Sequence, residues 1–320
     1  MNNLKKIGLS ALAGSLAAVS AHAADVTVSG SASITMDRPW TGGVTGNDFS
    51  MGDSLGFNMS GETDGGLGVA VYYEIDQDDM DDFDMTLSGD WGSLKFNGSG
   101  SSSAMGAVDD VTPNAYEEAW DIIDTDGTAT SGSPTVIGGG GGANMFIYTS
   151  PSFAGATVTV AYQNDGGAAA VEESYTDYAI AFSPEMVEGL TVGYAAGEAQ
   201  TAINNDRENS TAYVKYAVGG FTLGVQKSES DNDTASSSQE STAYGISYAV
   251  NDDFSIGYSV HNLEFDSAAT NNDEQESSGV SASYTMGGMT LAGAMNEVDN
   301  MDGVATADHE GYEFNLSFAF

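Results

Sequence analysis

The sequence contains no cysteine, only five prolines, and only seven lysines and arginines. The lack of cysteine excludes a disulfide framework, a zinc–thiolate cluster and a thiol nucleophile. The shortage of basic residues excludes a nucleic-acid partner, because neutralising phosphates requires a basic surface. Long apolar runs are missing as well, since no stretch approaches the roughly 20 apolar residues that a membrane-spanning helix needs.

Acidic residues dominate the charged part of the sequence. Asp and Glu number 47, and the formal net charge is −40 over 320 residues. Such an excess fits a channel wall that concentrates cations, and it equally fits a surface that stays hydrated in salt. Apolar residues make up 41% of the chain. They are spread along alternating runs and do not gather into the blocks that a large soluble core would require.

The first 23 residues have the pattern of an export signal. Lys5 and Lys6 supply a positively charged start, residues 7–19 form a short apolar stretch, and Ala21-His22-Ala23 is a small-x-small cleavage site. We therefore expect a signal peptide at residues 1–23 and a mature chain that begins at Ala24.

Alternating apolar and polar side chains, bounded by Gly, Asn, Asp and Ser, predict about sixteen β-strands. The last ten residues show the pattern clearly, since large apolar side chains alternate with small or polar ones up to Phe320. The predicted strands cover residues 26–36, 55–60, 67–76, 83–89, 93–98, 144–149, 156–163, 175–183, 190–196, 211–218, 221–228, 242–250, 254–263, 278–286, 289–296 and 311–320.

The connections between these strands alternate between short ones, such as residues 90–92, and long ones, such as residues 37–54, 77–82 and 99–143. A soluble sandwich or propeller has no reason to place every long loop at one end. A membrane barrel does, because its tight turns lie in the periplasm and its long loops outside. The sequence therefore predicts an all-β fold, a transmembrane antiparallel β-barrel at residues 24–320, surrounded by outer-membrane lipid.

The chain resembles the Gram-negative general diffusion porins, and it is most similar to their alphaproteobacterial branch. The resemblance lies in the leader, the opening ADVTVSGSASITM, the segment LSGDWGSLKFNG at residues 87–98, the long connection after it, and the terminal GYEFNLSFAF. It implies a homotrimer in the Gram-negative outer membrane, reached through the periplasm with the help of the barrel-assembly machinery. It also implies that the third extracellular loop, here Ser99 to Ala143, folds into the lumen. The assembly signal would comprise Tyr312, Phe314, Phe318 and Phe320.

Strand periodicity predicts which side chains face the lumen. With Leu94 and Phe96 outward, Lys95 faces inward, and Lys215 does so by the same argument. Lys227 falls in the outward phase, and we expect it at the membrane interface. The predicted lumen wall comprises Glu74, Asp84, Lys95, Lys215, His261 and Glu313, and Asp177 shares their phase.

The long connection at residues 99–143 carries seven carboxylates, and residues 115–123 read as a short helix. A loop folded inward would place this acid at the constriction of the pore, where it favours cations. The alternative is an outward, solvated loop. The predicted constriction residues are Asp109, Asp110, Glu117, Glu118, Asp121, Asp124 and Asp126.

A second acidic cluster, between residues 76 and 84, offers the oxygen ligands that Ca²⁺ prefers. It lacks the central glycine and the terminal glutamate of a helix-flanked calcium loop, so a solvated acidic loop is the favoured interpretation. A loosely bound Ca²⁺ is the alternative, and no other cofactor is expected. Its ligands would be Asp76, Asp78, Asp79, Asp81 and Asp82.

These features favour a water-filled channel for passive diffusion of small hydrophilic solutes and ions, with a preference for cations. One alternative is a substrate-specific channel, which would need a track of aromatic or basic residues along the lumen. Another is a plugged structural or adhesive barrel. Enzyme activity is not expected, because the mature chain offers only His261 and His309 as imidazole bases and no motif places a nucleophilic serine beside either.

Overall fold

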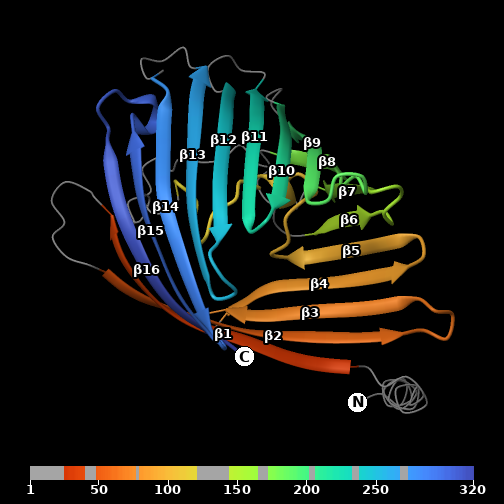
Figure 1. The fold of residues 1–320 in the computed structure, drawn as a ribbon. Helices are drawn as coiled ribbons and strands as arrows, with labels where there is room; N and C mark the ends of the chain where they lie inside the picture. The colour runs from red at the N-terminus through yellow and green to blue at the C-terminus, as the bar shows by residue number, and fades with distance from the viewer. Residues whose placement is uncertain are drawn as a thin grey trace, which may run out of the picture.

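The computed structural model describes residues 25–39, 48–76, 79–120, 144–164, 172–201, 206–232, 238–266 and 273–320. Within these residues, sixteen antiparallel strands close into a barrel, because each strand pairs with its sequence neighbours and β16 pairs with β1 (Figure 1). The predicted all-β barrel is confirmed. No helix in the described ranges is long and apolar enough to cross a membrane.

The elements have the following bounds. The strands are β1 (Asp25–Pro39), β2 (Asp48–Glu62), β3 (Gly68–Asp76), β4 (Asp79–Gly89), β5 (Gly92–Ser99), β6 (Met145–Thr149), β7 (Ala156–Asn164), β8 (Glu172–Phe182), β9 (Leu190–Thr201), β10 (Arg207–Val218), β11 (Phe221–Asn232), β12 (Ser238–Ala249), β13 (Phe254–Asp266), β14 (Gln275–Met286), β15 (Met289–Asp299) and β16 (His309–Ala319). Two short 3₁₀ turns are η1 (Gly106–Val108) and η3 (Met301–Gly303).

The strands turn an apolar face to the outside of the barrel. Consecutive strands place Val214, Leu223, Ile246 and Ile256 on this face, and all four are exposed. The alternate positions carry small or polar side chains that are buried on the inside, such as Thr211, Ser228, Ser241 and Ser259. This arrangement is the reverse of a soluble barrel, and it follows directly from the two-residue period of a strand.

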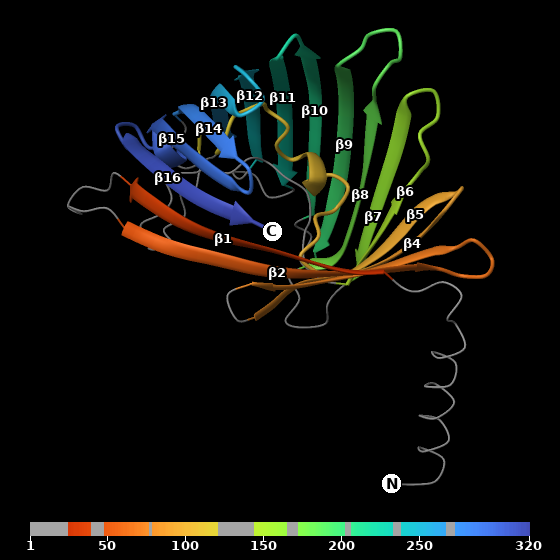
Figure 2. The same ribbon diagram turned by 60° about the horizontal axis from the view of Figure 1, so that its bottom comes forward.

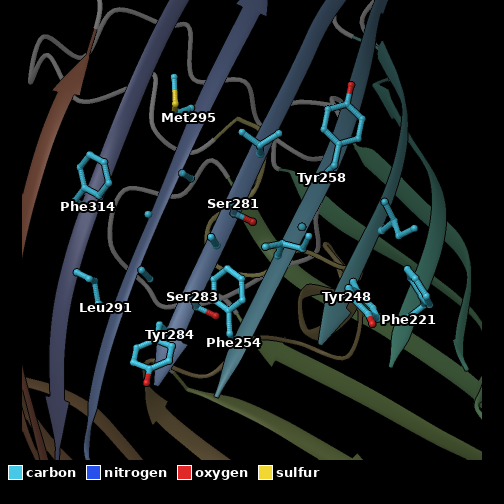
Figure 3. Close-up of a pocket in the computed structure, with 18 residues that line it drawn as sticks. Phe221, Tyr248, Phe254, Tyr258, Ser281, Ser283, Tyr284, Leu291, Met295 and Phe314 are labelled. Atoms are coloured by element: carbon cyan, nitrogen blue, oxygen red, sulfur yellow. The ribbon is translucent and has the colours of Figure 1, made fainter. Parts of the chain in front are cut away.

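A shallow apolar groove of about 770 Å³ runs over the strands from β11 to β16. Its floor includes Ala282 and Gly293, which lie directly opposite each other in β14 and β15. Larger side chains, among them Tyr258, Leu291 and Phe314, stand around it (Figure 3). The groove lies on the outer face, so it belongs to the apolar exterior and is separate from the lumen.

The predicted strand ends agree closely with the structure at the short connections and fall short at the long ones. The strands predicted at residues 211–218 and 221–228 extend in the structure over Arg207–Val218 and Phe221–Asn232. The added residues are polar, and Glu208 lies directly opposite Asp231. Backbone pairing needs no apolar side chain, so the sheet continues beyond the region where the apolar alternation is visible in the sequence.

In the acidic segment, Asp76 belongs to β3 and residues 79–84 belong to β4, so the long connection expected at residues 77–82 is wrong. β3 continues to Asp76, β4 begins at Asp79, and these two residues pair. Between Tyr73 and Ile75 the register shifts, which is the mark of a bulge. Four of the five expected calcium ligands therefore lie in strands, and Asp78 lies outside the described residues. Among the residues that the structure describes, no group of three or more His, Cys, Asp or Glu side chains is arranged to hold a metal ion.

The last residue of the chain closes the barrel against β1. The Phe320 amide donates to the Gly30 carbonyl and the Gly30 amide donates to the Phe320 carbonyl, both at 3.0 Å. The Phe320 ring covers Gly30, because a Cβ placed there would lie only 2.5 Å from the ring atom Cζ. Tyr312, Phe314 and Phe318 lie on the outer face of β16, where Tyr312 and Phe314 are in ring contact at 5.8 Å.

Candidate functional site

The segment that follows β5 lies on the inner face of the barrel wall. Figure 2 shows it in gold, crossing the interior of the ring of strands. Besides contacts of Ser101 with Lys95 and Asn97 in β5, its described part, residues 100–120, forms hydrogen bonds with inward side chains of five other strands. These partners are Asp177 in β8, Gln226 in β11, Ser281 in β14, Asn296 in β15 and Glu313 in β16.

Asp177 anchors the beginning of this segment. Its carboxylate, only 1% exposed, accepts hydrogen bonds from the amides of Ala104 at 3.2 Å and Met105 at 2.8 Å. The Tyr175 hydroxyl donates to the same carboxylate at 3.0 Å. Hydrogen bonds to a charged acceptor are the stronger kind, so this carboxylate fixes the chain just before η1.

The end of the described segment is held by β14, β15 and β16. The Ala115 amide donates to Ser281 Oγ at 3.0 Å, and the Asn296 side-chain amide donates to the Glu118 carbonyl. The Tyr116 hydroxyl donates to the Glu313 carboxylate. These contacts tie residues 115–118 to the inward-facing wall.

The short helix expected at residues 115–123 does not form over residues 115–120, which are bends and turns. Residues 121–123 lie outside the described part of the chain. The Glu118 carbonyl accepts from the Asn296 side chain, a bond that takes the place of one within a helix, whereas the Ala115 amide, which bonds to Ser281, would be free at the start of such a helix.

Four of the seven predicted constriction carboxylates are described, and Asp121, Asp124 and Asp126 are not. The four are Asp109, Asp110, Glu117 and Glu118. Burial raises the pKa of Asp110 to about 7, and its hydrogen bond to Glu118 acts in the same direction. Burial also raises the pKa of Asp109. Asp110 therefore titrates near neutral pH, at a place where a carboxylate would ordinarily be fully charged.

The inner face of β3, β4 and β5 carries an ion pair. Lys95 Nζ lies 3.1 Å from Asp84 Oδ2, and it also donates to Ser101 Oγ of the inner segment at 3.5 Å. Asp84 lies opposite Tyr72, whose hydroxyl donates to Glu74 at 2.9 Å. Lys95, Asp84 and Glu74 therefore share one inward face, and Asp84 is the ion-pair partner of Lys95.

Lys215 and His261 also face inward, whereas Lys227 faces outward. Lys215 lies opposite Gly224, which faces Pro113 of the inner segment. His261 is fully buried against Trp120, with ring centroids 4.6 Å apart, and its ring nitrogens have no hydrogen-bond partner among the described residues. On the outer face, Lys227 Nζ lies 2.6 Å from Glu240 Oε1.

Three residues that contact the inner segment have no distinguishing signal in the sequence: Gln226, Ser281 and Asn296. All three occupy the inward phase of their strands, and Gln226 is the neighbour of the outward Lys227. Periodicity alone could have placed them inside the barrel. It could not have shown which of them contact the inner segment, because the path of that segment is set by tertiary contacts.

Comparison with known proteins gives a family and a fold. A family model described as Gram-negative porin matches residues 8–303. No curated protein sequence matches significantly. Similar solved structures include the anion-selective porin from Comamonas acidovorans, with a TM-score of 0.69, 15% identity, and coverage of 93% of this chain and 100% of that one. OmpT of Vibrio cholerae in its trimer form has a TM-score of 0.68 at 10% identity, covering 93% and 100%. OmpF of Salmonella typhi in complex with daunomycin has a TM-score of 0.68 at 13% identity, covering 92% and 97%.

Proposed function

The chain belongs to the Gram-negative porin family, and from this premise we propose that its channel is cation-preferring and passes small hydrophilic solutes and ions by passive diffusion. Family membership makes it an outer-membrane porin. The finer proposal concerns the residues that line the channel and the sign of the charge that they favour.

One observation carries the cation preference: carboxylates outnumber bases on the inner face and on the segment that contacts it. The bases in the inward phase are Lys95, Lys215 and Arg207, and Lys95 is already paired with Asp84. The carboxylates include Glu74, Asp84, Asp177, Glu313, Asp109, Asp110, Glu117 and Glu118. A water-filled lumen with this balance has a negative potential, which attracts cations.

The position of the inner segment supports the proposal that the pore is narrowest at the level of these carboxylates. Residues 104–118 are hydrogen-bonded to the wall at Asp177, Gln226 and Ser281, so they occupy part of the lumen. The Comamonas porin with the same fold is anion-selective. The fold is therefore compatible with either preference, and the side chains at the narrow level decide which ions pass.

We also propose that the mature protein begins at Ala24, lies in outer-membrane lipid as a homotrimer, and is inserted by the barrel-assembly machinery. The export pattern of residues 1–23 supports the first point, although those residues lie outside the described part of the chain. The trimer form of Vibrio cholerae OmpT supports the second. Native mass analysis in mild detergent tests both, and a monomer of full precursor mass would refute them.

The reversal potential in a planar bilayer under a KCl gradient tests the ion preference. We predict a cation-selective potential that weakens as ionic strength rises, because the screening length falls from about 8 Å at physiological salt to about 3 Å at 1 M. An anion-selective potential would refute the proposal, and a protein that inserts without conducting would favour the plugged barrel.

A variant in which Asp109, Asp110, Glu117 and Glu118 are replaced by Asn or Gln localises the effect. We expect a smaller cation preference in a barrel that still folds, since these residues take no part in the strand ladder. The matched control carries Glu229→Gln and Glu240→Gln on the outer face, and it should keep the wild-type reversal potential. Equal potentials in both variants would show that residues 109–118 do not line the constriction.

A further inference from the structure

We propose that Gln226 is the positioning residue that holds the inner segment against the wall and thereby sets the width of the pore. The inference rests on the proposed function only in taking the barrel to be a conducting channel. Gln226 lies on the inner face of β11 and is 2% exposed. It is remote in sequence from the segment that it contacts, and no strand pairing links the two.

Both polar ends of the Gln226 side-chain amide form hydrogen bonds with the backbone of the segment. Its Oε1 accepts from the Val111 amide at 2.9 Å, and its Nε2 donates towards the carbonyls of Val108 at 2.7 Å and Asp109 at 2.9 Å. Thr211 Oγ1, 2.8 Å from Nε2, fixes the orientation of the amide. Val108 is the last residue of η1, residues 109–111 follow it, and none of the four belongs to a strand, so this one side chain supplies partners that a neighbouring strand would otherwise provide.

The wall next to Gln226 is shaped to receive the same segment. A Cβ at Gly224 would lie 2.5 Å from Pro113 Cδ, and one at Gly245 would lie 2.5 Å from the Pro113 carbonyl oxygen. These two glycines are directly opposite each other in β11 and β12. A Cβ at Gly257 in β13 would lie 2.7 Å from the Ala115 amide nitrogen. We call Gly224, Gly245 and Gly257 the glycine seat, because any larger residue there would displace the segment.

The seat and the amide have different tasks. Contact with a glycine surface is non-directional, so the glycine seat permits close approach but does not fix where along the wall the segment lies. Hydrogen bonds are directional, and those of Gln226 select Val108, Asp109 and Val111. Breaking them would leave buried backbone groups without partners, which favours release of the segment. Asp109 and Asp110 would then move with it.

The variant Gln226→Glu tests the proposal with almost no change in volume. A carboxylate has no hydrogen to donate, so it would face the carbonyls of Val108 and Asp109 as a second acceptor. We expect a loss of single-channel conductance and a rise in open-channel noise, because a segment released from the wall can move only into the lumen. The matched control is Gln200→Glu, which adds the same charge on β9, where Gln200 contacts Ser174 and Glu198.

The control should conduct as the wild type does. If Gln226→Glu also conducts as the wild type does, with unchanged noise, the positioning role is refuted. If Gln226→Glu does not fold, Gln226→Met makes the same test, since it removes both polar ends of the side chain and adds no charge. Reduced conductance in Gln226→Met supports the proposal, and wild-type conductance with unchanged noise refutes it.

A crosslink separates displacement of the segment from a general defect. The chain has no cysteine, so the pair Ala115→Cys and Ser281→Cys can form only the intended intramolecular disulfide within one chain. These residues are already in contact through the 3.0 Å bond from the Ala115 amide to Ser281 Oγ. Added to Gln226→Glu, the oxidised pair should restore conductance and the reduced pair should not. Failure of the oxidised pair to restore conductance would overturn the proposal.

These outcomes remain distinct from failure of the proposed function. A wild-type channel that conducts but prefers anions refutes the cation preference and leaves the positioning test intact, because conductance and its rescue do not depend on the sign of selectivity. A cation-selective wild type whose conductance is unaffected by Gln226→Glu refutes the positioning role alone.

Discussion

Asp110 links the charge of the pore to pH. Its carboxylate accepts hydrogen bonds from the amide and hydroxyl of Thr112, at 3.0 and 2.8 Å, yet burial and the neighbouring Glu118 raise its pKa to about 7. The pKa of Asp110 is higher in the folded protein than in the unfolded chain, where it has its ordinary value of 3.8. The resulting stabilisation is complete below about pH 4 and is lost as pH rises through about 7.

We predict that cation selectivity increases between about pH 6 and pH 8, as Asp110 gains its charge in this window. Asp110→Asn should flatten the increase, while Glu240→Gln on the outer face should leave it unchanged. Reversal potentials recorded across this range measure the effect. A wild-type potential that does not vary with pH would contradict the assignment, as would an Asp110→Asn channel that keeps the full increase.

Single residues also show the limit of what the sequence predicts about the site. The two-residue period is sufficient to place Lys95, Lys215 and His261 on the inner face, where the structure has them. It does not reveal that Lys95 is paired with Asp84 or that His261 is buried beneath Trp120. Those facts depend on a register shift in β4 and on the path of the inner segment, and neither leaves a periodic signal.

At the scale of elements, the extended ends of the strands bring like charges together on the outer face. Glu229 lies opposite Glu240, and Glu240 lies opposite Glu264. Directly opposed like charges destabilise a strand pair. Lys227 relieves this repulsion in β11 and β12, since its Nζ lies 2.6 Å from Glu240 Oε1 and 3.8 Å from Glu229 Oε1.

We predict that Lys227→Met lowers the thermal unfolding temperature slightly in low salt, and that the difference from wild type disappears at 1 M salt. The reason is that exposed charges are screened over about 3 Å at that concentration and over about 10 Å at 0.1 M. The measurement is circular dichroism during heating in detergent. If the unfolding temperature falls by the same amount at both salt concentrations, the packing of the lysine stem matters more than its charge.

The elements themselves were largely predictable, with informative exceptions. Apolar alternation placed β7, β10 and β13 because lipid-facing side chains must be apolar at every second position. It failed at residues 79–82, where β4 begins among acidic residues and Met80, exposed opposite Ile75, is the single apolar side chain. It also failed at residues 115–120, where wall side chains and not local propensity determine the backbone.

At the scale of the whole molecule, closure of the barrel depends on the meeting of its two ends. Phe320 exchanges two backbone hydrogen bonds with Gly30, each worth about 1 kcal/mol net, while the residue as a whole is 68% exposed. The folded barrel therefore loses little when this residue is removed. The resemblance to porins assigns the terminal aromatic a second task, that of a signal read during insertion.

We predict that deletion of Phe320 lowers the amount of protein in the outer membrane far more than it lowers the stability of barrels refolded in detergent. Phe320→Ala is the matched variant, because it keeps the backbone bonds to Gly30 and removes only the ring. Membrane fractionation measures the first quantity and the heat-dependent shift in gel mobility the second. Normal membrane levels of the truncated protein would rule out a signalling role for Phe320.

The inner segment is recognised mainly through its backbone. Gln226, Ser281 and Asn296 bond to amide and carbonyl groups, and the glycine seat lies against main-chain atoms and a proline ring. Such a site constrains the path of the chain while leaving most of its side chains free to vary. Pore chemistry and pore geometry can thus diverge independently during evolution. For engineering, the same separation makes residues 109 and 117 exchangeable positions at which a sensing or filtering group could be installed on an unchanged scaffold.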